Sequence, residues 1–199
     1  AAAALAVTAI TAQAQVYSVN TVGYVNQTLP AGTLVAVANP LDAGTNDLNN
    51  VLAGVPAKSS AQFWNGAGFD ISGKSAGGWS PNVAVPPGLG FFVNSKSAYT
   101  NTYVGELAAN AGESVTNALP AGALVMVGSP LPYAGDLNTA ELNLALPAKS
   151  SAQFWNGAGY DLSGKTASAW SPALPVNVAQ GFFLNSKAAY DWVQTAPAN

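Results

Sequence analysis

The sequence predicts an all-β protein of two tandem small β-sandwich or partly open β-barrel domains, each with at most one short helix. Three observations support this prediction. Residues 56–68 (PAKSSAQFWNGAG) recur without a change at 147–159, which indicates an internal duplication. β-branched and aromatic residues fill the segments between turn signals. The offset of 90 to 91 residues between the copies is too long for a solenoid unit and suits a small domain.

The duplication defines the domain boundaries. Residues 16–107 form the first predicted domain and residues 108–199 the second, and the second begins with a linker-like AANAG sequence. In each domain an LPAG turn precedes an apolar run, TLVAVA at 33–38 and ALVMV at 123–127. Runs of this kind are typical of strands that are buried on both faces or central in a sandwich. We expect both segments in such positions.

One short helix is expected after this strand in each domain. Asp47 is placed to cap a turn that carries Leu48, Val51 and Leu52. Asp136 holds the corresponding position in the second copy. The leucines that would follow it on a helix are Leu137, Leu142 and Leu144.

The duplicated block is expected to form a β-hairpin. Side chains alternate between the two faces of a strand, so Ala61 and Phe63 share one face while Gln62 and Trp64 share the other. The Asn-Gly pair that follows Trp64 favours a type I′ turn, because both residues tolerate a positive φ. The returning strands would begin at Phe69 in the first copy and at Tyr160 in the second.

The two copies are expected to differ at their ends. The first copy continues as one more strand over residues 99–107, whereas the second runs out soon after residues 190–193. This difference predicts that the second domain lacks a strand and has an open edge. A matching of Tyr103-Val104 to Trp192-Val193 would weaken that prediction.

Three motifs follow one another in the first copy: Asn-Pro-Leu at 39–41, FWNGAGF at 63–69 and PGLGFFV at 87–93. This order resembles repeat domains of secreted, surface-associated bacterial proteins. The second copy keeps the middle motif at 154–160 but begins the first motif with Ser129 and has VAQG in place of the Pro-Gly turn. The resemblance implies an extracellular β-domain. Its motifs are turn and core residues, so it transfers no catalytic residue.

The composition argues against most enzyme and nucleic-acid functions. Only 8% of the 199 residues are charged, the net charge is -3, and the six basic residues are all Lys. Phosphate binding needs concentrated positive charge, so we expect no nucleic-acid partner. The chain has no His and no Cys, which removes the usual general base and the commonest zinc ligands. We expect no enzyme activity, no cofactor and no metal.

Residues 1–15 (AAAALAVTAITAQAQ) are interpreted in two ways. The apolar run and the Ala-Gln-Ala sequence are typical of the end of a secretory signal peptide, and the run is too short to span a bilayer. Alternatively, the segment is retained and Leu5, Val7 and Ile10 form an assembly strand that a neighbouring subunit binds. Both interpretations predict a secreted, extracellular or cell-surface protein without a transmembrane segment.

Two sets of duplicated residues are candidate sites. Lys58 and Lys149 are candidates for an isopeptide crosslink, which needs a Lys, an amide and an acid buried together. Ordinary solvated lysines that the duplication copied are the favoured alternative. Exposed aromatic rings could also stack on sugars, although such residues are more often core or interface residues. The aromatic candidates for an interface or for sugar stacking are Trp64, Trp79, Trp155 and Trp170.

Taken together, these features predict a secreted structural protein. It would be the repeating subunit of a homopolymeric extracellular or cell-surface filament or sheath, assembled head-to-tail with strand donation from the N-terminal segment. The alternative is a carbohydrate-binding or adhesive module that binds surface polysaccharide through the duplicated Trp residues. Exposure of Trp64 and Trp155 together on one face would favour this alternative.

Overall fold

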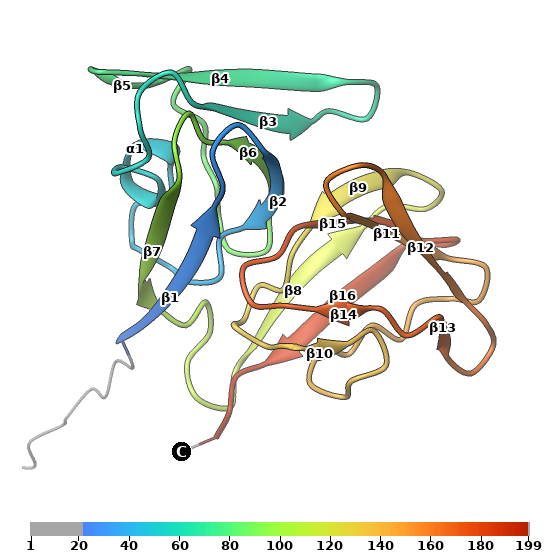
Figure 1. The fold of residues 1–199 in the computed structure, drawn as a ribbon. Coiled ribbons are helices and arrows are strands. Elements are labelled where there is room, and N and C mark those ends of the chain that lie inside the picture. The colour runs from blue at the N-terminus through green and yellow to red at the C-terminus, as the bar shows by residue number, and fades with distance from the viewer. Residues whose placement is uncertain (1–21, 199) are drawn as a thin grey trace, which may run out of the picture.

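The structure of the chain is a computed structural model that describes residues 22–198 (Figure 1). Its elements are β-strands apart from one short helix, and all pairings between the strands are antiparallel. Each repeat builds one five-stranded sheet and one two-stranded ribbon, and no sheet mixes strands of the two repeats. The predicted all-β, duplicated sandwich is therefore confirmed, with open sheets rather than a closed barrel in the described part of the chain.

The first repeat has a sheet with the strand order β2-β6-β3-β4-β5. Its strands are β2 (Leu34–Ala38), β6 (Gly90–Asn94), β3 (Ser60–Trp64), β4 (Phe69–Ser75) and β5 (Gly78–Ser80). The ribbon pairs the first strand of the repeat with the last, β1 (Val22–Leu29) with β7 (Tyr99–Glu106).

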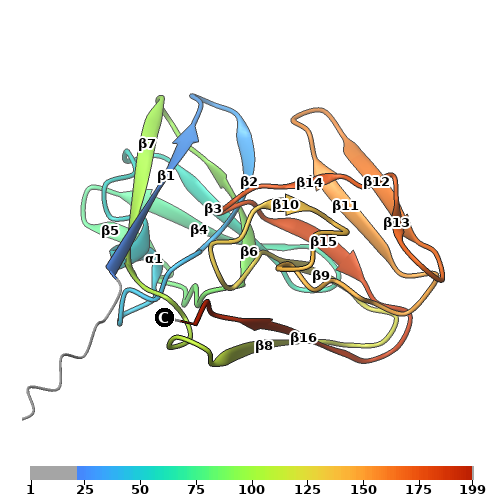
Figure 2. The same ribbon diagram turned by 90° about the horizontal axis from the view of Figure 1, so that it is seen from below.

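The second repeat has the same arrangement, with the strand order β9-β15-β11-β12-β13. Its strands are β9 (Leu124–Val127), β15 (Phe182–Asn185), β11 (Ser151–Trp155), β12 (Tyr160–Lys165) and β13 (Trp170–Ser171). Its ribbon pairs β8 (Ser114–Leu119) with β16 (Tyr190–Thr195), and a short additional pair joins β10 (Gly135–Asp136) to β14 (Pro175–Val176). The two ribbons are well separated in both views of the molecule (Figures 1 and 2).

The second repeat does not lack a strand. β16 is its last strand, as β7 is in the first repeat, and each pairs with the first strand of its own repeat. The registers also agree, because Leu29 faces Tyr99 in one ribbon and Leu119 faces Tyr190 in the other. The prediction of a missing strand was wrong. It was based on the shorter length of chain after the Gly-Phe-Phe motif in the second repeat, but this shorter segment still forms the last strand, β16.

The apolar strands β2 and β9 are buried on both faces but are not central. Each is the edge strand of its sheet. In β2, Val37 belongs to the core of the first repeat, while Ala36 belongs to a separate cluster that both repeats share. Burial on both faces therefore comes from the other repeat and not from a central position in the sheet.

The helix prediction is confirmed in one repeat only. In α1 (Leu48–Val51) the Asp47 side chain accepts a hydrogen bond from the backbone N–H of Asn50, as an N-cap does. In the second repeat Asp136 lies in β10, and residues 108–198 contain no helix. The residues that follow alternate instead, with Leu142, Leu144 and Leu146 buried and their intervening neighbours exposed. This period of two suits an extended chain and not a helix.

The core of each repeat lies between the inner face of its sheet and its ribbon. Ala61 and Phe63 point into the first core and Trp64 to the opposite face, as predicted. The hairpin that follows has a four-residue loop instead of the two-residue type I′ turn. Asn65 accepts hydrogen bonds from the backbone N–H groups of Ala67 and Gly68, at 3.1 and 2.8 Å, and this closes the longer loop.

Candidate functional site

The outer faces of the two sheets meet, and the duplicated tryptophans join them. The indole N–H of Trp64 in β3 donates to the carbonyl of Leu124 in β9 at 2.8 Å. The indole N–H of Trp155 in β11 donates to the carbonyl of Leu34 in β2, also at 2.8 Å. Both rings are half-buried. Because Trp155 is the copy of Trp64 and Leu124 is the copy of Leu34, the two contacts are reciprocal.

A second pair of backbone contacts repeats this reciprocity. The N–H of Ala38 donates to the carbonyl of Ala179 at 2.8 Å, and the N–H of Gly128 donates to the carbonyl of Gly88 at 3.0 Å. In the aligned copies Ala38 corresponds to Gly128 and Gly88 to Ala179. The repeats are therefore related by a local twofold axis, and each presents the same surface to the other, as in an isologous dimer.

The centre of this interface is apolar and tightly packed. Its buried residues are Ala36, Phe92, Met126 and Phe183, and the rings of Phe92 and Phe183 lie 6.1 Å apart. The sheets approach each other closely at the glycine of each Gly-Phe-Phe motif. A Cβ at Gly90 would lie 2.6 Å from the backbone oxygen of Val127.

Gly181 has the same role as Gly90 on the other side of the axis. A Cβ on this residue would lie 2.5 Å from the backbone oxygen of Val37. The sequence shows that both copies have a glycine before the Phe-Phe pair. The reason is the close contact with the edge strand of the other repeat, which cannot be deduced from the motif.

Trp79 and Trp170 lie elsewhere. Their exposed fractions are 3% and 2%, and each belongs to the core of its own repeat. Their indole N–H groups donate to the carbonyls of Leu52 and Leu144. The prediction of an interface or sugar-stacking role was wrong for these two residues, because neither face of a buried ring is available to a ligand.

The lysines proposed for a crosslink are exposed turn residues. Lys58 and Lys149 have φ values of 69° and 71°, and their backbone N–H groups each donate to a backbone carbonyl at 2.7 Å. The side chains are not buried beside an amide and an acid. The crosslink prediction is therefore contradicted, because the reaction needs the apolar burial that shifts a lysine pKa.

Exposed apolar side chains continue the interface outward. Phe69 and Ile71 lie on β4, and their copies Tyr160 and Leu162 lie on β12. The two aliphatic side chains are 61% and 62% exposed. Phe69 contacts Trp64 and Phe92 with ring-centroid distances of 5.2 and 5.7 Å, so this strip begins inside the interface. We call residues 69 and 71 the β4 patch, and residues 160 and 162 the β12 patch.

A third exposed apolar cluster lies on the ribbon of the first repeat. Val22, Tyr24 and Val104 are exposed there, and Tyr24 lies opposite Val104 in the ladder. The corresponding positions of the second ribbon carry Ser114 and Thr195. This cluster is therefore not duplicated.

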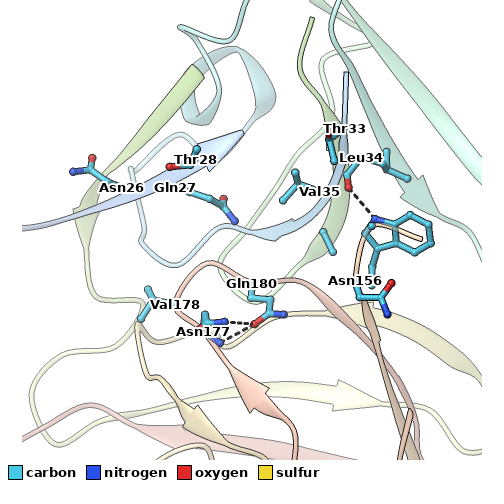
Figure 3. A pocket seen from close by; sticks show the side chains of 13 residues that line it. Asn26, Gln27, Thr28, Thr33, Leu34, Val35, Asn156, Asn177, Val178 and Gln180 are labelled. Carbon is cyan, nitrogen blue, oxygen red and sulfur yellow. Dashed lines mark hydrogen bonds between the residues drawn. The ribbon is translucent and has the colours of Figure 1, made fainter. Parts of the chain in front are cut away.

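Two grooves of similar size flank the interface, one beside each edge strand. The groove beside β2 has a volume of about 450 Å³ and lies between β1, β2 and residues 155–157 and 177–180 of the second repeat (Figure 3). The groove beside β9 has a volume of about 460 Å³ and lies between β8, β9 and residues 86–89 of the first repeat, without a contribution from residues 64–66. The local twofold axis relates the two positions.

The remaining predictions concern the N-terminal segment, metal ligands and membrane spans. Leu5, Val7 and Ile10 belong to the part of the chain that the structure does not describe. Among residues 22–198, no three His, Cys, Asp or Glu side chains gather as metal ligands would. Within the same range no helix has the length and apolar character needed to span a membrane.

Comparison of the chain with protein-family models, with curated proteins and with solved structures finds no match. The resemblance to repeats of surface-associated bacterial proteins therefore remains a prediction.

Proposed function

We propose that this protein is a secreted structural protein, the repeating subunit of an extracellular or cell-surface filament or sheath. The observation that supports this proposal best is the pair of apolar patches on β4 and β12. Exposed apolar patches on soluble proteins commonly mark interaction sites. A second copy of the chain is the partner that fits, because each patch continues an interface in which the same residue types already pack against one another.

The symmetry of the molecule supports an open chain. The local twofold axis gives every subunit two related patches that differ in their residues, Phe69 and Ile71 against Tyr160 and Leu162, so a subunit that binds through the β4 patch still has the β12 patch free. Contacts from the β4 patch of one copy to the β12 patch of the next are heterologous and continue without closing, unless their rotation happens to form a ring. This is head-to-tail assembly of the kind that the sequence predicts.

The composition is consistent with a structural role. With 8% charged residues, neighbouring subunits would meet with little desolvation of charge. Without His or Cys, the chain lacks the residue types that most often act as catalytic bases and nucleophiles, so a non-enzymatic role is the simpler proposal.

Strand donation by Leu5, Val7 and Ile10 is a separate hypothesis about the mechanism of assembly. It no longer has support from a missing strand, because β16 completes the second ribbon. A chain that begins at residue 16 tests it. If this chain assembles like the longer one, the N-terminal segment is not the connecting element.

The alternative of a sugar platform built from duplicated tryptophans has less support. Trp64 and Trp155 lie on opposite sides of the local axis, and the indole N–H of each is already bonded to the other repeat. The two rings therefore do not form one exposed surface on which a polysaccharide could lie.

The assembly proposal is tested with paired substitutions. We expect the wild-type chain to form linear polymers in sedimentation velocity and negative-stain microscopy, and the Ile71→Ser/Leu162→Ser double variant to remain monomeric. The matched control is Val104→Ser, which removes a similarly exposed apolar side chain from the unduplicated ribbon cluster and should leave assembly unchanged.

Mixing the two single variants tests the direction of the contact. Ile71→Ser retains the β12 patch and Leu162→Ser retains the β4 patch. Each alone should be monomeric, while an equimolar mixture should form 1:1 dimers. A wild-type chain that stays monomeric at high concentration would refute the proposal, as would polymers of the double variant.

A further inference from the structure

The groove beside β2 differs in chemistry from its symmetry-related counterpart. None of the 13 residues that line it is charged, and seven of them carry an amide or a hydroxyl group. These seven are Asn26, Gln27, Thr28, Thr33, Asn156, Asn177 and Gln180. The half-buried ring of Trp155 and the aliphatic side chains of β2 supply an apolar wall.

The counterpart groove shows that the scaffold does not require these polar residues. At the positions of Asn177 and Gln180 it has Pro86 and Leu89, and at the position of Thr28 it has Ala118. In both grooves the first strand of the ribbon, the edge strand and the loop before the Gly-Phe-Phe motif of the other repeat line the walls, while Trp155, Asn156 and Gly157 line the first groove alone. Thr116 and Asn117 keep the second groove polar at the positions of Asn26 and Gln27. The polar side chains of Thr28, Asn177 and Gln180 are therefore the additions to a frame that also folds with apolar residues.

Several of these polar groups are held in place with hydrogen-bonding capacity left over. The Gln180 Oε1 accepts from the backbone N–H and the Nδ2 of Asn177, at 2.9 and 3.0 Å (Figure 3). The Asn26 Oδ1 accepts from the Thr102 hydroxyl at 2.7 Å. Within the described residues, the Nε2 of Gln180, the Nδ2 of Asn26 and the Thr28 hydroxyl have no protein partner, so donors and an acceptor remain for a ligand.

An added peptide strand does not fit this edge. Strand addition needs free backbone groups along the edge of β2. The carbonyl of Leu34 is taken by the Trp155 indole, and the carbonyl of Ala36 accepts from the backbone N–H of Gly181 at 3.2 Å. The N–H of Ala38 is also bonded across the interface. The side chains, and not the backbone edge, are the groups that remain for recognition.

We propose that the groove beside β2 binds an uncharged saccharide unit of a neutral polysaccharide. Amide groups both donate to and accept from sugar hydroxyls, and an indole ring offers an apolar surface to the C–H face of a pyranose. A charged ligand is disfavoured, because the groove has no opposite charge to offset its desolvation. The proposal is independent of assembly through the β4 and β12 patches.

The test uses the full chain and a panel of neutral hexasaccharides, namely β-1,4-linked gluco-, manno- and xylo-oligosaccharides and β-1,3-linked gluco- and galacto-oligosaccharides. Binding is measured by isothermal titration calorimetry and by tryptophan fluorescence. We expect at least one neutral probe to bind, and hexagalacturonate, an anionic probe of the same length, not to bind.

The variants exchange groove residues for those of the counterpart groove. Thr28→Ala/Gln180→Leu should weaken binding at least tenfold and leave the melting temperature unchanged, because Ala118 and Leu89 occupy the corresponding positions of the counterpart groove. Ala118→Thr/Leu89→Gln in the other groove is the matched control and should leave affinity unchanged. Assembly should be the same in all of them, so failure here and failure of the structural proposal are distinguishable.

Three results would overturn the proposal. The first is that no neutral probe binds. The second is that the Thr28→Ala/Gln180→Leu variant binds as tightly as the wild type. The third is that an uncharged extended peptide, such as a (Thr-Val)₃ hexapeptide, binds in the groove and is lost in the same variant while the saccharides do not bind.

Discussion

Tyr103 connects the core of the first repeat to the interface through a single glutamine. Its hydroxyl donates to the Gln27 Oε1 at 2.8 Å, and the Gln27 Nε2 donates to the carbonyl of Ala179 in the second repeat at 2.9 Å. Burial raises the pKa of Tyr103 well above its usual range, and a hydrogen bond to Asn101 lowers it by a smaller amount. The ring is buried with 3% of its surface exposed. Ionisation of this one side chain therefore affects both the core and the interface.

This raised pKa predicts a loss of stability in alkaline solution. Below pH 10 the tyrosine is protonated in both the folded and the unfolded chain, so it adds no pH dependence. Above pH 10 the unfolded chain loses the proton and the folded chain keeps it, so the free energy of unfolding falls by about 1.4 kcal/mol per pH unit from this group. Urea unfolding between pH 8 and 11 should show this slope in the wild type and a shallower one in Tyr103→Phe.

The control for this prediction is Tyr24→Phe, because Tyr24 is exposed and unfolding changes its surroundings little. This variant should keep the wild-type slope. At pH 8 we expect Tyr103→Phe to be destabilised by about 1 kcal/mol, since Gln27 loses a partner. Equal slopes in the wild type and Tyr103→Phe would contradict the assignment.

At the scale of elements, the helix shows how far one signal determines local structure. The same Asp-Leu-Asn sequence begins both segments, at residues 47–49 and 136–138, but only the first forms a helix. In α1 the Asp47 carboxylate accepts from Asn50 and from the Nδ2 of Asn82, at 2.9 Å each. The two repeats differ in the spacing of the apolar residues that follow, and that spacing, not the cap, decides between helix and extended chain.

Removal of the Asp47 cap should destabilise the first repeat. Asp47→Ala leaves the N–H of Asn50 and the Nδ2 of Asn82 without this acceptor, and we expect the free energy of unfolding to fall by about 1 kcal/mol. Asp47→Asn keeps a capping oxygen and should recover most of this loss. Urea denaturation of the three proteins measures the difference. Equal stability of Asp47→Ala and the wild type would show that the cap is not a stabilising contact.

The strands and hairpins could be predicted from the sequence because their signals are local. Alternation in residues 60–64 assigned Phe63 to the core and Trp64 to the other face, and the structure agrees. What Trp64 meets on that face could not be predicted. Its hydrogen bond to Leu124 spans 60 residues, and no spacing rule connects two positions across an interface between repeats.

At the scale of the whole molecule, the duplication fixes the fold of each repeat but not their relation. Two identical 13-residue blocks are compatible with two arrangements of the repeats. Repeats stacked by translation leave one contact surface free at each end, whereas repeats related by a twofold rotation bind each other through the same surface. The contacts of Trp64 and Trp155 select the rotation. An assembly of whole molecules must therefore use surface that this internal contact leaves free, as the β4 and β12 patches do.

The local twofold axis also predicts how separated repeats should behave. An isolated repeat exposes its half of the interface, which is nearly self-complementary, so residues 16–107 alone should form a symmetric homodimer. The central positions are unequal, however, since one repeat contributes Ala36 and the other Met126 to the same buried cluster. A small residue opposite a large one fills space better than two small or two large residues.

Mixing the separately produced repeats, residues 16–107 and 108–199, should therefore convert homodimers into a heterodimer. Native mass spectrometry distinguishes the three dimers by mass, and we expect the heterodimer to be the most abundant species and to have the highest melting temperature. Met126→Ala in the second repeat removes the size difference and should bring the three dimers close to a statistical ratio. Repeats that stay monomeric, alone and mixed, would show that the interface depends on the covalent connection, which raises the effective concentration of the two halves to the millimolar range.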